Sequence, residues 1–213
     1  MESTYGNRDH TSVAGARDEL ARVIRETVAR GGRVLIPAFA VGRTQELLYD
    51  LHQLTHEGRI PRVPVVIDSP LAHEATEVFR DNTRDFDQSE PMVRAHEADL
   101  TALFEFDQLR FTPAVEDSKA TMREHGPMIV IAASGMVESG RILHHLAHSA
   151  GDPRTTILIV GYQAEHTLGR RIMERQPTIK VLGEELPLRA QVEVLSGYSA
   201  HADRTELRRW LDA

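Results

Sequence analysis

A series of short apolar runs, each followed by a small-residue turn and a helical pattern, constrains the fold of this chain more than any other feature. Neighbouring residues within these runs are apolar instead of alternating with polar ones, which is typical of strands buried on both faces. Strands of that kind, alternating with helices, form a mostly parallel sheet flanked by helices. The sequence therefore predicts an α/β fold. The runs span residues 33–39, 63–68, 109–112, 128–133 and 156–160.

Apolar residues at helical spacing follow most of these runs. Ser69 and Pro70 have the order typical of a helix start, an N-cap residue and then proline at the first helical position. Gly31 and Gly32 are expected to end the first helix. The predicted helices lie around residues 20–28, 46–51, 115–124, 142–146 and 168–173.

The turns after the strands are candidate ligand-binding positions. In parallel sheets ligands bind at the carboxyl ends of the strands, where helix N-termini direct free N–H groups outward. Gly42, Ser69, the Ser134-Gly135 pair and Tyr162 all fall at that edge. Anion binding is one interpretation and tight strand–helix connection is the other, and the sequence favours neither.

The pattern changes towards the C-terminus. Residues 179–189 resemble a hairpin with short arms, and the apolar run 192–195 predicts a further strand. Asp203 and Glu206 have capping-box spacing at the start of a closing helix. Earlier in the chain, the polar stretch 81–97 is predicted to be a loop or a mobile pair of helices.

Composition limits the classes of function. The 213 residues suffice for one substantial core, and a formal net charge of −7 argues against a general electrostatic grip on nucleic acid. Lys119 and Lys180 are the only lysines among the 25 lysine and arginine residues, so arginine predominates. Arginine suits planar contacts with phosphate, but biased codon composition explains the excess of arginine over lysine better. Cysteine, a membrane-length apolar run and a signal-peptide pattern are all absent. We therefore expect a cytoplasmic protein.

The most informative motif is the Ser199–Asp203 segment, which has His201 at its centre and follows the predicted strand 192–195. An imidazole at a strand end can transfer protons near neutral pH. A carboxylate beside it would fix its tautomer and favour its charged form. Glu2, near the other end of the chain, is the candidate carboxylate.

A set of motifs along the chain resembles the β-CASP branch of the metallo-β-lactamase superfamily. The nearest relatives implied are RNA-processing nucleases of bacteria and archaea, similar to the endonuclease subunit of eukaryotic pre-mRNA cleavage and polyadenylation. The motifs occur in the family's order and extend over essentially the whole chain. They are residues 2–6, 36–43, 68–72, 133–136, 161–165 and 196–203.

The resemblance implies a metallo-β-lactamase core that carries a pair of zinc ions, with the β-CASP cassette inserted as a lid over the substrate. It assigns catalytic roles to His201, as general acid or as the group that polarises the scissile phosphate, and to Glu2, which orients His201. A zinc-bound hydroxide would be the nucleophile. The implied function is zinc-dependent hydrolysis of RNA phosphodiester bonds.

The chain departs from the family pattern at the metal. The His-x-His-x-Asp-His run and the further His and Asp ligands of the family are missing, so no zinc ligand set is expected here. We expect residues 1–10 to be the edge of the metallo-β-lactamase core, 11–190 the β-CASP domain, and 191–213 the truncated return strand and helix of that core. Such a fragment would clamp substrate but be inactive alone.

The turn residues Arg43, Ser134, Gly135 and Thr167 are the candidate substrate contacts. As phosphate ligands they would act from the strand ends, close to the catalytic pair. Arg43, Ser134 and Thr167 could equally cap their own helices. The sequence leaves both readings open.

Other histidines carry weaker signals. His144, His145 and His148 share one predicted helix, and a solvated helix face is favoured over metal ligation because no His-Glu-x-x-His motif accompanies them. His166 is predicted to be a plain surface histidine in a turn. At its position the resembling family usually has glycine.

Several alternatives stay open. A DNA-processing β-CASP nuclease would differ in the third β-CASP motif, which this chain does not contain. A non-catalytic nucleic-acid-binding or interaction module is the second alternative. A nucleotide-binding domain is disfavoured, because no Gly-x-Gly-x-x-Gly or Walker-type loop follows any strand. The expected partner is RNA and not a membrane, and the exposed edge where the core would dock would allow a homodimer.

Overall fold

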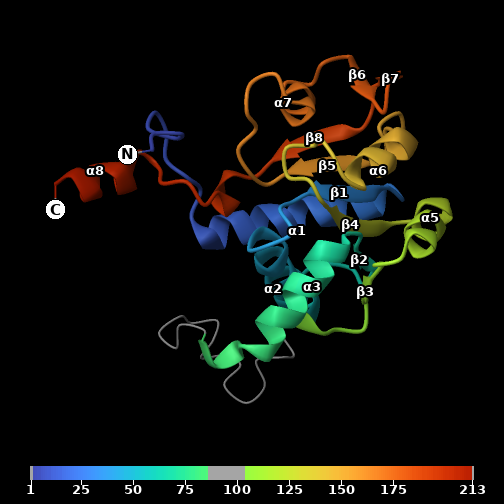
Figure 1. Ribbon diagram of the computed structural model, residues 1–213, viewed down its shortest axis with the longest axis horizontal. Coiled ribbons are helices and arrows are strands. Elements are labelled where there is room, and N and C mark those ends of the chain that lie inside the picture. Colours follow the sequence, from blue (N-terminus) through green and yellow to red (C-terminus); the bar gives the residue numbers. More distant parts are fainter. Residues whose placement is uncertain (1, 86–103, 213) are drawn as a thin grey trace.

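The computed structural model describes residues 2–85 and 104–212 (Figure 1). In this part of the chain, six parallel strands form one sheet in the order β3-β2-β4-β1-β5-β8. This arrangement confirms the predicted mostly parallel α/β fold. The strands are β1 (Arg33–Pro37), β2 (Val65–Ile67), β3 (Leu109–Phe111), β4 (Met128–Ala132), β5 (Thr156–Ile159) and β8 (Gln191–Val194).

The middle of the sheet is buried on both faces, as its continuous apolar runs require. Every residue of β4 and β5 is buried. In the register of β1 against β4, Val34 lies opposite Ile129 and Ile36 opposite Ile131. Successive residues point to opposite faces, so each of these strands supplies both hydrophobic layers.

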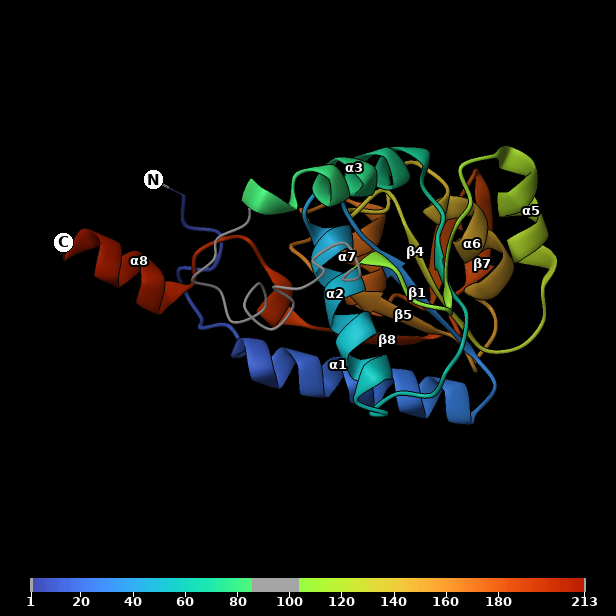
Figure 2. The ribbon, with the colours of Figure 1, turned by 90° about the horizontal axis from the view of Figure 1, so that it is seen from below.

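One face of the sheet is covered by three helices, α1 (Val13–Ala29), α2 (Arg43–His56) and α3 (Pro70–Asp81). Leu20, Leu47 and Leu51 pack there against Val34 and Ile36 of β1. The predicted start of α3 is confirmed: the Ser69 hydroxyl caps the helix, and proline occupies its first turn. Figure 2 shows these helices side by side along the sheet.

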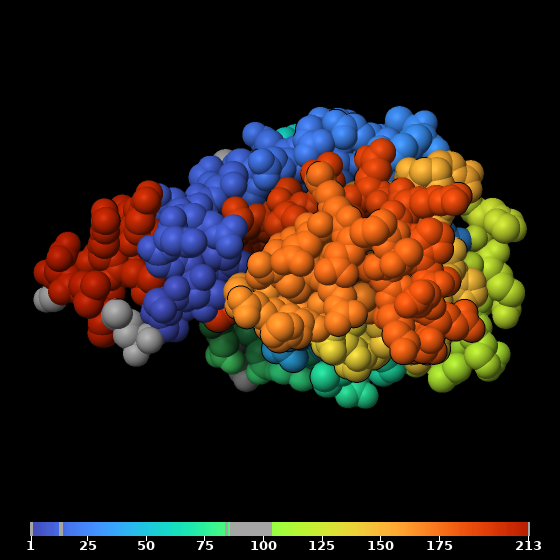
Figure 3. All heavy atoms as spheres, turned by 90° about the horizontal axis from the view of Figure 1, so that it is seen from above, coloured from blue at the N-terminus to red at the C-terminus, as the bar shows by residue number. Residues whose placement is uncertain are grey.

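The other face is covered by α6 (Ile142–Ser149), α7 (Leu168–Met173) and an antiparallel hairpin, β6 (Thr178–Val181) with β7 (Glu184–Pro187). The hairpin confirms the prediction over residues 179–189. Figure 3 shows α7 and the hairpin as a continuous orange layer over this face. The further helix α5 (Val115–Arg123) lies beyond α6 in Figure 1.

The two ends of the described chain lie together, away from the sheet (Figures 1 and 2). The short helix η3 (Ser196–Tyr198) follows β8 and leads to α8 (Arg204–Leu211), which begins with the predicted Asp203–Glu206 capping box. A parallel bridge joins Tyr5 to Asp203. The N-terminal segment is therefore held against the segment that carries His201.

The predicted loop or helix pair over 81–97 lies mostly outside the described residues; its first residues end α3 and form the short helix η1 (Thr83–Asp85). Within residues 2–85 and 104–212, no helix combines the length and apolar character needed to cross a bilayer. The domain boundaries at residues 10 and 190 stay a prediction.

Candidate active site

Glu2 and His201, from opposite ends of the sequence, lie in contact. Oε2 of Glu2 is 3.4 Å from Nδ1 of His201. The main-chain N–H of Ala202 donates to Oε1 of Glu2 at 2.8 Å, and that of Thr4 donates to Oε2 at 2.9 Å. The carboxylate is therefore anchored by both segments, and it also contacts the imidazole.

These contacts keep Glu2 charged. Hydrogen bonds from Thr4, then from Ala202, together with the field of His201, lower the pKa of the Glu2 carboxyl from 4.5 to about 2. At neutral pH the group is therefore a carboxylate, which can only accept hydrogen bonds. A carboxylate beside Nδ1 favours the imidazole tautomer with N–H at that atom.

Aromatic rings surround the imidazole. The ring centroids of Tyr162 and Tyr5 lie 6.0 Å and 6.2 Å from that of His201, both at steep angles. His10 packs edge-on against Tyr5 at 4.7 Å, and its Nε2 lies 2.9 Å from the main-chain oxygen of His201. The His201 loop is thus held from the side as well as by Glu2.

The loop is also anchored to the helices beneath it on the sheet by a buried hydrogen bond, which the sequence did not indicate. The Tyr198 hydroxyl donates to Oδ2 of Asp50 in α2 at 2.6 Å. Burial and the neighbouring Asp50 carboxylate raise the pKa of Tyr198, so the phenol remains a donor. Arg17 of α1 bonds the other oxygen of Asp50 through Nε at 2.8 Å. Two helices therefore fix the segment immediately before His201.

A cavity of about 360 Å³ opens beside His201 at the carboxyl edge of the sheet. The loops after β1, β4 and β5 form its walls, and residues 199–201 close one side. The candidate site is therefore where a parallel sheet of this type places its ligands.

Two of the predicted substrate contacts, Arg43 and Gly135, line this cavity. The Arg43 guanidinium forms an ion pair with Glu46 and lies 5.8 Å above the Tyr198 ring. Gly135 accepts a hydrogen bond from the Gln163 side chain through its main-chain oxygen at 2.9 Å. The structure thus brings both residues close to the Glu2–His201 pair.

The other two predicted contacts are engaged locally and do not line that cavity. The Ser134 hydroxyl accepts hydrogen bonds from the main-chain N–H groups of Glu138 and Ser139, at 3.2 and 3.3 Å. The Thr167 hydroxyl caps α7 by accepting from the N–H of Arg170 at 3.2 Å. For Thr167 the geometry matches the capping alternative, whereas Ser134 bonds within its own turn and the N-cap of α6 is Arg141.

The expected solvated histidine face on α6 is wrong for one residue. His144 and His148 are exposed, but His145 is completely buried and its Nε2 lies 2.6 Å from Oδ2 of Asp68. Asp68 is 77 residues away in sequence, so helical spacing carried no signal of this contact. The buried carboxylate also accepts from Thr112, Ser118 and Arg141.

His166 is exposed, as predicted for a surface histidine. Its φ is +70°, in the left-handed region that favours glycine. Glycine, which the resemblance places here, suits this conformation, and in this chain a residue with a side chain adopts it.

The described side chains do not fit a zinc site. Within residues 2–85 and 104–212, no group of three or more His, Asp or Glu side chains is placed to hold a metal ion. Glu2 and His201 together could supply two ligands. Zinc takes four ligands as a rule, three of them from the protein in catalytic sites.

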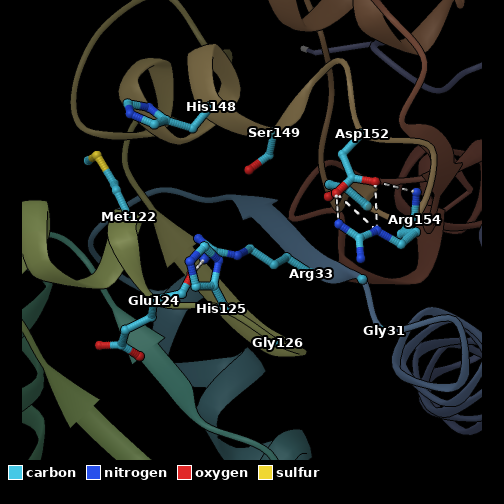
Figure 4. A pocket seen from close by; sticks show the side chains of 12 residues that line it. Gly31, Arg33, Met122, Glu124, His125, Gly126, His148, Ser149, Asp152 and Arg154 are labelled. Atoms are coloured by element: carbon cyan, nitrogen blue, oxygen red, sulfur yellow. Dashed lines mark hydrogen bonds and ion pairs between the residues drawn. The ribbon is translucent and has the colours of Figure 1, made fainter.

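A second cavity, of about 300 Å³, lies at the opposite edge of the sheet, where β1 and β4 begin (Figure 4). Its charged groups have partners within the chain. Asp152 accepts from Arg154, and Arg33 donates to the main-chain oxygens of Thr121 and Glu124 at the end of α5. Cations are favourable at helix C-termini, so Arg33 acts here as a structural cap.

Two family models match the chain. The Beta-Casp domain matches residues 44–172, and the Zn-dependent metallo-hydrolase RNA specificity domain matches residues 185–213. The first covers most of the sheet and its helices, and the second covers β8 and the His201 segment. Zinc dependence is thus a property of the family to which the second match points.

Named relatives match along nearly the whole chain. Ribonuclease TTHA0252 of Thermus thermophilus is 43% identical over 210 residues, which is 99% of this chain and 48% of the relative. The transcription termination factor FttA of Methanosarcina mazei is 32% identical, and that of Methanocaldococcus jannaschii 33%, each over 99% of this chain and 34% of the relative. The chain spans about half or a third of these curated relatives. With more than half of its length matched by the Beta-Casp model, on a fold that the motifs had predicted, the chain belongs to the Beta-Casp family.

Proposed function

We propose that this chain is the substrate-clamping cassette of a zinc-dependent ribonuclease, and that Glu2 and His201 handle a proton at the scissile phosphate. The observation that carries the proposal is the anchored carboxylate–imidazole contact, 3.4 Å long, at the mouth of a cavity on the carboxyl edge of the sheet. The relative named a ribonuclease supports RNA as the substrate.

The chain's own residues suggest how this pair works. Glu2 stays ionised and holds the Nδ1 proton of His201, so Nε2 can carry the transferable proton. A protonated imidazole placed there donates a hydrogen bond to a phosphate oxygen, or its proton to the departing oxygen, which is general acid catalysis. The described side chains do not provide a metal site, so they supply neither the zinc nor the attacking oxygen.

Arg43 and Gly135 line the same cavity and are proposed as substrate contacts. Ser134 and Thr167 are proposed to act indirectly, by shaping the turns that carry the site, because their hydroxyls already accept hydrogen bonds from main-chain N–H groups of those turns.

A hybrid enzyme tests the proposal. In it, this chain replaces the stretch of the Thermus thermophilus ribonuclease that it matches, so that the relative's remaining half is present. The hybrid should cleave single-stranded RNA in preference to DNA. His201→Ala should lower the cleavage rate about 10²- to 10⁴-fold, the usual contribution of general acid catalysis, with zinc content unchanged.

The matched control is His144→Ala, which removes an exposed histidine of α6 and should leave cleavage unchanged. Equal loss in both variants, or full activity of His201→Ala, refutes the catalytic assignment. A hybrid that binds RNA and zinc but cleaves nothing would instead favour a non-catalytic module. Preferential cleavage of DNA would favour the DNA-processing alternative.

A further inference from the structure

The cavity beside His201 has an aromatic wall that the proton-handling role does not use. Phe39, in the loop after β1, lines the cavity and is 54% exposed, and the neighbouring Val41 is 58% exposed. Large apolar side chains exposed together at a cavity usually mark a binding site.

The Phe39 ring is held in position from one side. It packs over Gly135, where a Cβ atom would lie 3.1 Å from two of the ring carbons, Cδ2 and Cε2. The main chain is fixed as well, because the Thr44 hydroxyl donates to the Phe39 oxygen at 2.8 Å. A ring fixed on one side and exposed on the other loses little conformational entropy when a ligand stacks on it.

The charges around the cavity disfavour a second phosphate there, besides the one proposed to face His201. Arg43 is the arginine among the lining residues, and it is already paired with Glu46 and stacked over Tyr198. Phe39, Val41 and Met136 make the remaining walls largely apolar. A flat, uncharged heteroaromatic ring with a few polar edge atoms suits such walls, and Tyr162 and His201 offer polar atoms to its edge.

We propose that this cavity binds one nucleobase of the RNA strand, next to the nucleotide whose phosphate faces His201, and that the base stacks on Phe39. The inference rests on the proposed function and adds a substrate-binding position to it. Stacking is tolerant of sequence because every base has a π-face, so the position favours single-stranded RNA without selecting one base.

Fluorescence anisotropy with short single-stranded RNA tests the proposal on the chain itself. Phe39→Ala should weaken binding about 5- to 150-fold, which corresponds to the usual 1–3 kcal/mol per stacked base, whereas Phe39→Trp should preserve it. Val115→Ala is the matched control, because Val115 is exposed to a similar degree (58%, against 54% for Phe39) but lies outside the cavity. Unchanged urea midpoints would show that all variants fold.

A scan of RNAs, each lacking one base, separates stacking from a general surface effect. With the unsubstituted chain, loss of one particular base should weaken binding, and in Phe39→Ala the same loss should have no further effect. The proposal is overturned if Phe39→Ala binds as tightly as the unsubstituted chain, if it weakens binding to intact and base-free RNA alike, or if the unsubstituted chain binds no RNA. The Glu2–His201 proposal is judged separately, by cleavage in the His201→Ala hybrid.

Discussion

Asp68→Asn is the substitution whose effect the structure defines most sharply. The Asp68 carboxylate is completely buried at the end of β2. Its Oδ1 accepts from Thr112 at 2.9 Å and from Arg141 at 2.8 Å, and its Oδ2 lies 2.6 Å from both the Ser118 hydroxyl and His145 Nε2. One carboxylate therefore connects four parts of the fold: the end of β2, Thr112 directly after β3, helix α5 and helix α6.

The substitution retains the volume of the side chain but removes its charge. Breaking a buried ion pair by removing one partner typically costs about 3–5 kcal/mol, because the other charge stays buried without compensation. That is a large fraction of the roughly 5–15 kcal/mol that stabilises a typical domain. With a urea dependence of about 1–3 kcal/mol per M, the unfolding midpoint should fall by at least about 1 M.

The pH dependence of unfolding supplies a second measurement. Hydrogen bonds from His145, Ser118, Arg141 and Thr112 outweigh the effect of burial and lower the pKa of Asp68 below its ordinary value. The stability that this carboxylate contributes is therefore complete above its unfolded pKa of about 3.9 and is lost as the pH falls towards the folded value. In Asp68→Asn this acid-side loss should be smaller.

The assay is urea unfolding followed by circular dichroism, between about pH 3 and pH 7, for three proteins. Asp107→Asn is the control, since Asp107 is an exposed acid in a turn and should change stability by less than about 0.5 kcal/mol. The inference that this buried network stabilises the fold would be refuted by two results together. Asp68→Asn would lower the free energy of unfolding by less than about 1 kcal/mol, and that free energy would fall with decreasing pH as steeply as in the unsubstituted chain.

Three further predictions concern the site and its loops. Tyr198→Phe removes the hydrogen bond to the buried Asp50 carboxylate and should cost about 1.5–3 kcal/mol in urea unfolding; a change under about 0.5 kcal/mol would contradict that anchor. His166→Gly relieves a positive φ of +70° and should stabilise the chain by up to about 1 kcal/mol, whereas the control His144→Gly, inside α6, should destabilise it by a similar amount. The Glu2 carboxyl should titrate by carbon NMR with a pKa of about 2, well below 4.5, because Thr4 and Ala202 donate to it; titration at the ordinary value would show that these contacts do not form in solution.

The parallel sheet and the order of its strands and helices followed from local pattern. The continuous apolar runs predicted β4 and β5, and the spacing of Asp203 and Glu206 predicted the capping box that begins α8. Such features are readable in a sequence because the interacting residues are at most a few positions apart, or because burial on both faces imposes its own composition. The pairing of Glu2 with His201 was reached in another way, from motifs that resemble a family.

Only the tertiary structure decided which distant segments of the chain contact each other. Three histidines on one helix looked alike in sequence, yet His145 is buried against Asp68 while His144 and His148 face solvent. Likewise, Thr167 caps its own helix and Gly135 lines the cavity, although both stand at strand–helix turns. Which face of a helix is covered, and which turn opens on a cavity, depends on packing between segments far apart in the chain, and local periodicity carries no record of that packing.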